Sequence, residues 1–203
     1  IRLPEGILNP PFPDDPKQAP AVVGGNVETS QRLCDTLIKA FRLSACSQGT
    51  MNNLIFGNER LSYYETIGGG HGAGDGYHGA SAVHSHMTNT GLTDPELLEY
   101  RFPVRVNRFS VRKGSGGSGK YHGGDGIIRD LTFSEPVSLA LLTQHRESGP
   151  FGLDGGEAGE PGRQRLIRTG GEEEQLGHVA AVHLEAGDRL ILETPGGGGF
   201  GQK

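Results

Sequence analysis

Histidines, acids and glycines, the residue types that build polar active sites, gather between residues 63 and 95 of this chain. That segment holds eight of the 35 glycines, four of the eight histidines and three acids, Glu65, Asp75 and Asp94. Glycine lets the backbone approach another backbone or a ligand closely, although ordering it costs conformational entropy. A long loop without secondary structure is uncommon in a compact domain unless it has a function. The segment is therefore the first candidate for a functional site.

Two histidines in this segment, His84 and His86, stand two residues apart. If residues 83–90 form a strand, the two imidazoles share one face, which Thr88 and Thr90 continue. An imidazole can take a proton from a reacting group, and two imidazoles beside a carboxylate can hold a divalent metal. We predict His84 or His86 as a catalytic base. Metal ligation and hydrogen bonding to the glycine-rich backbone are the alternatives.

The acids that flank the histidines are the next candidates. A carboxylate sheltered by glycine backbone and tyrosines can have a raised pKa and act as a base, which applies to Glu65 and Asp94. Asp94 also precedes the sequence Pro-Glu-Leu-Leu and is equally suited to cap a helix. Buried imidazole N–H groups need acceptors, so we expect Glu65, Asp75 or Asp94 within reach of the histidines.

A polar triplet, residues 144–146, follows a strongly apolar stretch, and such a triplet at a strand end often faces a site. Its arginine, Arg146, can bind a carboxylate through two hydrogen bonds. A solvated strand end is the equally open alternative.

Two glycine patterns resemble nucleotide-binding loops without completing them. Residues 114–120 almost spell a P-loop, but Tyr121 stands where Ser or Thr must hold magnesium. Residues 74–79 match G-x-G-x-x-G, yet neither pattern leads into a helix that could face a phosphate. We therefore predict no ATP site in this chain.

Composition favours a loop-rich β protein. Of 203 residues, only 33% are hydrophobic, and the net charge is −5 with no basic stripe, which argues against nucleic acid as a partner. No apolar run reaches the roughly 20 residues of a membrane span. Two cysteines, Cys34 and Cys46, predict free thiols in a reducing compartment, and so a cytoplasmic location.

The order of elements predicts one proline-rich lead-in and one domain. Residues 1–21 hold six prolines and should be extended, while residues 22–203 should form a single α+β, mainly β domain. A helix is expected at about 30–43, capped by Thr29 or Ser30 and packed on an antiparallel or mixed sheet. Its apolar side would carry Leu33, Cys34, Leu37, Ile38 and Phe41.

The second half of the chain alternates as strands do. Apolar residues at 102, 104 and 106 and then at 109 and 111 change parity, which predicts a bulge near Asn107. Further strands are expected at 127–133 and 137–142, with Leu142 buried on both faces. Residues 185–188 predict the turn of a hairpin between strands around 182–184 and 190–192.

Nine short stretches, in one order along the chain, make it similar to a known family. They are GGNVETSQ (24–31), SQGTMNN (47–53), YET (64–66), VHSHMTNT (83–90), TDPE (93–96), GSGG (114–117), GGDG (123–126), PFGL (150–153) and TPGGGG (194–199). Each one is weak, but the ordered set resembles the C-terminal part of the B-type subunit of the hydantoinase/5-oxoprolinase family, including N-methylhydantoinase B.

That resemblance implies an enzyme that opens a cyclic amide, such as 5-oxoproline or a hydantoin. ATP and magnesium would belong to an A-type partner subunit or domain, and this chain would be a fragment that lacks an N-terminal part, binds no ATP and is inactive alone. Within an oligomer, His84 or His86 would be the base. A divalent metal is possible, and the predicted substrate-binding residues are Gly69, Gly70, Gly72, Asn89, Thr90 and Arg146, with glycine N–H groups as oxyanion donors. The alternatives are a non-catalytic docking domain and a subunit of a related acetone or acetophenone carboxylase.

Overall fold

The structure is a computed structural model that describes residues 4–6, 9–18, 28–49 and 51–203. Of the predicted proline-rich lead-in, residues 1–3, 7–8 and 19–21 lie outside the described residues, and the described part includes the short 3-10 helix η1 (Pro16–Gln18). The two helices are α1 (Glu28–Ala40) and α2 (Pro95–Arg101). No helix in the described ranges is long and apolar enough to cross a membrane.

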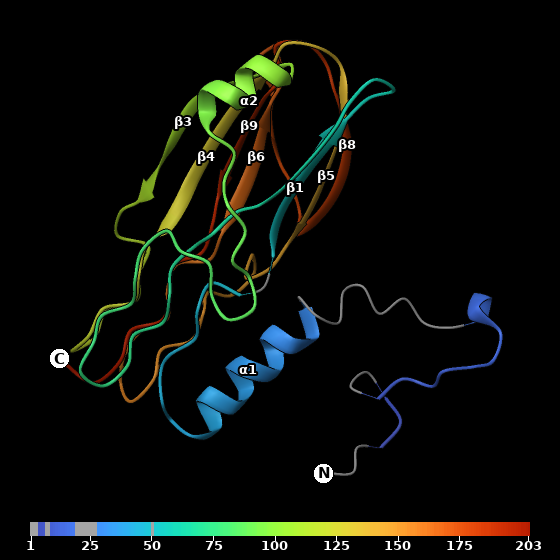
Figure 1. Cartoon of the computed structure of the whole chain (residues 1–203). Coiled ribbons are helices and arrows are strands. Elements are labelled where there is room, and N and C mark those ends of the chain that lie inside the picture. The colour runs from blue at the N-terminus through green and yellow to red at the C-terminus, as the bar shows by residue number, and fades with distance from the viewer. Residues whose placement is uncertain (1–3, 7–8, 19–27, 50) are drawn as a thin grey trace.

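Two antiparallel sheets form most of the fold (Figure 1). One has the strand order β2-β1-β5-β8 and the other the order β3-β4-β9-β6-β7. The strands are β1 (Asn52–Gly57), β2 (Ser62–Thr66), β3 (Val104–Arg112), β4 (Gly126–Phe133), β5 (Val137–Thr143), β6 (Arg163–Ile167), β7 (Glu173–Gln175), β8 (Val179–Leu184) and β9 (Arg189–Glu193). The predicted class, α+β and mainly β, is confirmed.

The core lies between the two sheets and is built from alternating apolar residues of both. Phe56 of β1 packs against Phe133 of β4 with ring centroids 5.3 Å apart, and both are almost completely buried. The predicted bulge is confirmed, because the pairing of β3 with β4 shifts register between Val106 and Arg108. We expected Leu142 to be buried because both faces of its strand would be covered, but it is 39% exposed on the outer face of its sheet.

The predicted hairpin around residues 185–188 is wrong, although its turn is present. The N–H of Asp188 donates to the carbonyl oxygen of Glu185 at 3.1 Å. The strands on either side belong to different sheets, since β8 pairs with β5 whereas β9 pairs with β4 and β6. Alternation and a turn signal fit a hairpin and a crossing between sheets equally well, so the pattern could not distinguish them.

Below the sheets in Figure 1, extended glycine-rich segments run side by side without forming a sheet. We call this region the glycine bundle; it comprises residues 45–48, 69–74, 115–124, 151–160 and 195–201. Its hydrogen bonds recur every three residues: Gly196 and Gly199 donate to Glu160 and Glu157, and Gly197 and Phe200 donate to Gly124 and Tyr121. A period of three is the turn of a polyproline II helix. Each such segment can therefore bond to several neighbours at once.

Helix α1 lies beside these loops rather than on a sheet (Figure 1). Its buried residues are polar, Gln31 and Asp35, while Leu33, Leu37 and Phe41 are 43%, 48% and 71% exposed. The predicted packing of its apolar side on the sheet is therefore wrong. The predicted cap is wrong as well, because Thr29 and Ser30 already lie inside the helix.

Candidate functional site

The polar side of α1 bonds to a turn at residues 85–88, which contains one of the predicted histidines, His86. We call Gln31, Arg32 and Asp35 the α1 polar face. Gln31 donates to Thr88 Oγ1 at 2.6 Å, and Asp35 Oδ1 lies 2.7 Å from His86 Nε2. Residues three and four positions apart on a helix share a side, so Gln31 and Asp35 can bond to one turn at two points.

Residues 83–90 do not form the predicted strand. Only Val83 makes a bridge, to Gly69, and the N–H of Thr88 then closes a turn onto the carbonyl oxygen of Ser85 at 3.1 Å. His86 lies in this turn with φ +55°, a conformation that is uncommon for a residue with a side chain. The period-2 face of His84, His86, Thr88 and Thr90 therefore does not exist.

His86 and Asp35 form a buried pair whose side chains are only 9% and 8% exposed. A carboxylate can only accept, so His86 Nε2 carries the proton that it donates to Asp35. In its neutral form the ring then has Nδ1 as its acceptor, and no described residue bonds to that atom. A histidine oriented in this way by an acid is suited to act as a general base.

The acids expected beside the histidines are engaged elsewhere. Glu65 lies in the core between the two sheets, which together we call the sandwich. There its Oε2 accepts from Arg129 Nη2 at 3.0 Å and from the Tyr63 hydroxyl at 2.7 Å. Burial raises the pKa of Tyr63 to about 12. Asp94 caps α2 by accepting from the N–H groups of Glu96 and Leu97, which is the alternative that its position allowed, and Asp75 is exposed.

The glycines predicted to bind substrate use their N–H groups within the fold. Gly69 donates to the Val83 carbonyl, Gly70 to the Pro195 carbonyl, and Gly72 to Ser47 Oγ at 3.1 Å. These three N–H groups are therefore engaged within the fold and are not free to act as oxyanion donors. Glycine is required for a different reason: a Cβ on Gly70 would meet the carbonyl oxygen of Gly124 at 1.9 Å.

His84 and its exposed neighbours Asn89 and Thr90 lie at the edge of the turn. Thr90 Oγ1 is 3.4 Å from His84 Nε2, while His84 Nδ1 is buried and has no partner among the described residues. Burial lowers the pKa of His84, which favours its neutral form. Nearby in sequence or structure, Asp35 Oδ2, Ser85 Oγ and Gln48 Nε2 are also buried without partners in the described part. Such groups often mark a ligand or water site.

The thiol of Cys46 belongs to the same neighbourhood. It is buried, forms no disulfide and donates to the Ser47 carbonyl oxygen at 3.3 Å. Burial together with the negative charge of Asp35 raises its pKa to about 12. A thiol with such a high pKa is a poor nucleophile at neutral pH. Cys46 is therefore a packing residue beside the site.

Two sequence patterns, a metal-binding cluster and a nucleotide-binding loop, can be compared with the described residues. No three of their His, Cys, Asp or Glu side chains gather closely enough to hold a metal ion. The P-loop-like segment uses its N–H groups internally, since Gly117 donates to Gly197 and Lys120 to Gly201. It leads into β4 rather than a helix, so these residues do not fit the phosphates of ATP.

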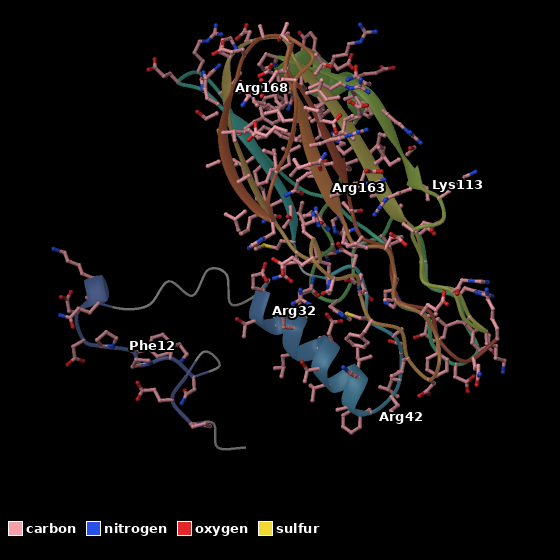
Figure 2. The ribbon with its side chains drawn as sticks, turned by 180° about the vertical axis from the view of Figure 1, so that it is seen from behind. Phe12, Arg32, Arg42, Lys113, Arg163 and Arg168 are labelled. Carbon is pink, nitrogen blue, oxygen red and sulfur yellow. The ribbon has the colours of Figure 1, made fainter. Side chains whose placement is uncertain are left out.

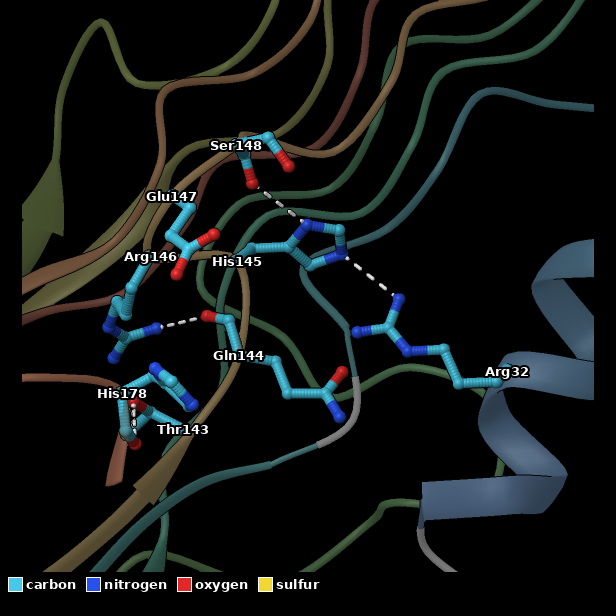
Figure 3. A pocket seen from close by; sticks show the side chains of 8 residues that line it. All are labelled: Arg32, Thr143, Gln144, His145, Arg146, Glu147, Ser148 and His178. Carbon is cyan, nitrogen blue, oxygen red and sulfur yellow. Dashed lines mark hydrogen bonds between the residues drawn. The ribbon is translucent and has the colours of Figure 1, made fainter. Parts of the chain in front are cut away.

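Arg146 lies in a separate pocket of about 360 Å³ at the end of β5 (Figure 3). Arg32 of the α1 polar face lines the same pocket, and its Nη1 is 3.2 Å from His145 Nε2. Arg32 lies on the half of α1 nearer the sheets, whereas Arg42 lies at the far end (Figure 2). The α1 polar face thus connects the His86 turn with this pocket.

Asp35 and Arg32 were not predicted as site residues, and His145 was noted only as part of the polar triplet at residues 144–146. The polar residues of α1 recur at helical spacing, which identifies a continuous face. Polar faces of amphipathic helices usually meet water, so the spacing alone gives no sign that this face is buried. Its burial arises from contacts with segments distant in the sequence.

Comparisons with known proteins identify the family. The family profile for hydantoinase B/oxoprolinase matches residues 1–203. A 5-oxoprolinase of Dictyostelium discoideum is 50% identical over 98% of this chain, which spans 15% of that relative. An ATP-dependent caprolactamase from Pseudomonas jessenii superposes with a TM-score of 0.72 at 27% identity, covering 87% of this chain and 34% of that one. An acetone carboxylase at 18% identity, with a TM-score of 0.64 over 84% of this chain and 28% of that one, shares the fold. The chain belongs to the hydantoinase B/oxoprolinase family.

Proposed function

We propose that this chain is part of an ATP-dependent enzyme that hydrolyses a cyclic amide of the 5-oxoproline type. The observation that carries the proposal is the 50% identity to a 5-oxoprolinase over nearly the whole chain. ATP and magnesium would bind to an A-type partner subunit or domain. The complete enzyme would work in the cytoplasm.

Within that reaction, the Asp35–His86 pair supplies the base. ATP on the partner would supply the phosphoryl group that activates the amide carbonyl oxygen, and a second water would release that group as phosphate after the ring has opened. Asp35 holds His86 so that Nδ1 accepts a proton from water while the water oxygen bonds to the carbonyl carbon. As the ring C–N bond breaks, the same proton passes from Nδ1 to the leaving nitrogen. The 2.7 Å bond between Asp35 and His86 supports this assignment.

The test uses the full-length enzyme assembled with its A-type partner. We expect His86→Gln to lower ATP-dependent turnover of 5-oxoproline by about 10²-fold or more, and Asp35→Asn to lower it less. His183→Gln is the matched control, because His183 is a largely exposed histidine on β8. Unchanged turnover in His86→Gln would contradict the base assignment.

A second candidate is a docking domain that carries no chemistry. The exposed apolar side of α1, with Leu33, Leu37 and Phe41, favours it, because such a side is usually covered in a finished assembly. In that case His86→Gln would leave turnover intact, whereas Leu37→Asp would weaken association with the A-type partner. A carboxylase reaction is the enzymatic alternative, and activity on acetone rather than 5-oxoproline would support it.

A further inference from the structure

The pocket at the end of β5 is lined by two arginines that have no acidic partner. Arg32 comes from α1 and Arg146 from the segment after β5, and Figure 3 shows their side chains on opposite sides of the pocket. Eight other arginines of the described chain each lie within ion-pair distance of a carboxylate, whereas these two, like Arg101, Arg105 and Arg108, do not. Two positive groups at one hollow without a counter-charge are unusual and require an explanation.

Arg146 is fixed in place by neutral groups only. Its Nε donates to Gln164 Oε1 at 3.0 Å and its Nη1 to Asn52 Oδ1 at 2.9 Å. Its Nη2 is buried and has no partner among the described residues. Burial, and then the positive charge of Arg112, lower the pKa of Arg146 to about 9. A buried guanidinium without a counter-ion is costly, so the fold holds a charge whose natural partner is an anion.

Arg32 is oriented by a histidine in a defined tautomer. His145 Nδ1 lies 3.1 Å from the carbonyl oxygen of Ser148, which can only accept, so Nδ1 carries the proton. Nε2 must then accept from Arg32 Nη1 at 3.2 Å. Burial, together with the charge of Arg32, lowers the pKa of His145 and favours this neutral form. His145 therefore positions Arg32 without neutralising it.

The acids near the pocket leave both arginines available. Glu147 lines the pocket but is exposed and bonds to neither guanidinium, and Glu28 accepts from Gln144 instead. A volume of about 360 Å³ is within the range of small-molecule sites. The pocket thus combines adequate space with excess positive charge.

We propose that this pocket binds the carboxylate of an anionic cyclic amide, with Arg146 Nη2 and the free nitrogens of Arg32 as donors. This assignment rests on the proposed function, because 5-oxoproline is a lactam that carries a carboxylate. A phosphate offers the same oxyanion chemistry. We favour the carboxylate because Arg146 has only one nitrogen free, and the donors approach from two sides rather than surrounding a tetrahedral group.

The experiment measures binding by calorimetry in the full-length enzyme without ATP. Three probes are compared: 5-oxoproline, 2-pyrrolidinone, which has the same ring without the carboxylate, and inorganic phosphate. We expect 5-oxoproline to bind more tightly than 2-pyrrolidinone, and Arg146→Met to remove about 10- to 100-fold of that preference. Arg105→Met, at an exposed arginine of β3, is the control and should change nothing.

Arg32→Met, at the helix surface, tests the pocket independently if Arg146→Met fails to fold. Equal binding of the two lactams would overturn the proposal. So would a preference for 5-oxoproline over 2-pyrrolidinone that persists both in Arg32→Met and in a folded Arg146→Met variant. Phosphate binding that depends on Arg146 but is not displaced by 5-oxoproline would overturn the carboxylate assignment. Binding is measured without turnover, so an absence of lactam hydrolysis would count against the proposed function and not against this site.

Discussion

The sandwich and the glycine bundle are neighbouring parts of one chain that are held together by opposite means. In the sandwich, large side chains such as Phe56, Leu131 and Phe133 fill the space between two sheets. In the glycine bundle, backbone packs directly against backbone, and hydrogen bonds between extended segments replace the apolar core. We therefore expect the sandwich to lose stability when side-chain atoms are removed, and the glycine bundle to lose stability when side-chain atoms are added.

The largest effect is expected from adding one methyl group to the bundle. In Gly124→Ala the new Cβ would meet the Ala80 carbonyl oxygen at 1.9 Å and its carbon at 2.4 Å, both backbone atoms. We expect a loss of about 4 kcal/mol of unfolding free energy in urea denaturation, at the upper end for a single substitution. Gly170→Ala, where no atom lies within 4 Å, is the control. Equal stability of the two variants would refute the close-packed backbone.

Removing atoms from the sandwich should have a slightly smaller effect. Leu131 of β4 is 0% exposed in the core. Leu131→Ala should therefore cost about 3 kcal/mol of unfolding free energy, from lost burial and the cavity left behind. The same truncation at Leu33, which is 43% exposed on α1, should cost far less. Comparable losses at both positions would mean that the apolar side of α1 is covered in the molecule that is measured.

A third, smaller effect concerns the cap of α2, which lies beside the sandwich. Asp94 Oδ1 accepts from the N–H groups of Glu96 and Leu97 at 2.9 and 3.2 Å. We expect Asp94→Ala to lower unfolding free energy by about 1 kcal/mol, and Asp94→Asn to preserve most of it. The measurement also separates a cap from a catalytic acid, because a cap affects stability while leaving the turnover of the folded enzyme unchanged.

The smallest effect should be a local response to pH that distinguishes the sandwich from the His86 turn and the 144–148 segment. Burial lowers the pKa of His84 and His145. These neutral histidines therefore contribute stability above their unfolded pKa of about 6.5, and the contribution is lost as pH falls through the lowered values. In the sandwich, burial raises the pKa of Asp130, but bonds from Arg189 and Asn107 outweigh it and lower the pKa. The stability that ionised Asp130 contributes is present above its unfolded pKa and is lost only below about pH 4.

NMR titration between pH 7.5 and 4.5 tests this order. Signals from the His86 turn and the 144–148 segment should change below about pH 6, while core methyl signals of the sandwich stay constant. Simultaneous loss of both sets would show that the two regions respond as one unit.

How far the sequence predicts this molecule depends on whether a pattern is local. The parity change at Asn107 lies within one strand, so the bulge in β3 could be located in advance. The turn at residues 185–188 was also predicted, but its strands join different sheets, and pairing partners are not encoded in alternation. Local patterns therefore located the turn, whereas the sheet that each strand joins depends on contacts between segments distant in the sequence.

The candidate site was predicted less well than the fold, for the same reason. His86 was predicted as a candidate base, but the acid that it bonds to is Asp35, 51 positions away in the sequence, rather than Glu65 or Asp94. The polar stripe of α1 was visible, yet nothing in the helix itself indicates that this side faces the loops. Histidines in a glycine-rich segment were treated as strand residues, whereas His86 occupies a turn at positive φ.

The period-three bonding of residues 196–201 has a consequence for the time at which the protein can fold during synthesis. These six residues donate to carbonyls at positions 160, 124, 46, 157, 121 and 153, all of which leave the ribosome earlier. These carbonyl groups therefore lack their native hydrogen bonds until residues 196–201 have left the ribosome. Joining segments so distant in sequence is slow, since the chain entropy of a long loop must be overcome first. The bundle should thus complete only after residue 201 has left the ribosome, and until then its earlier segments stay open to aggregation and to chaperones.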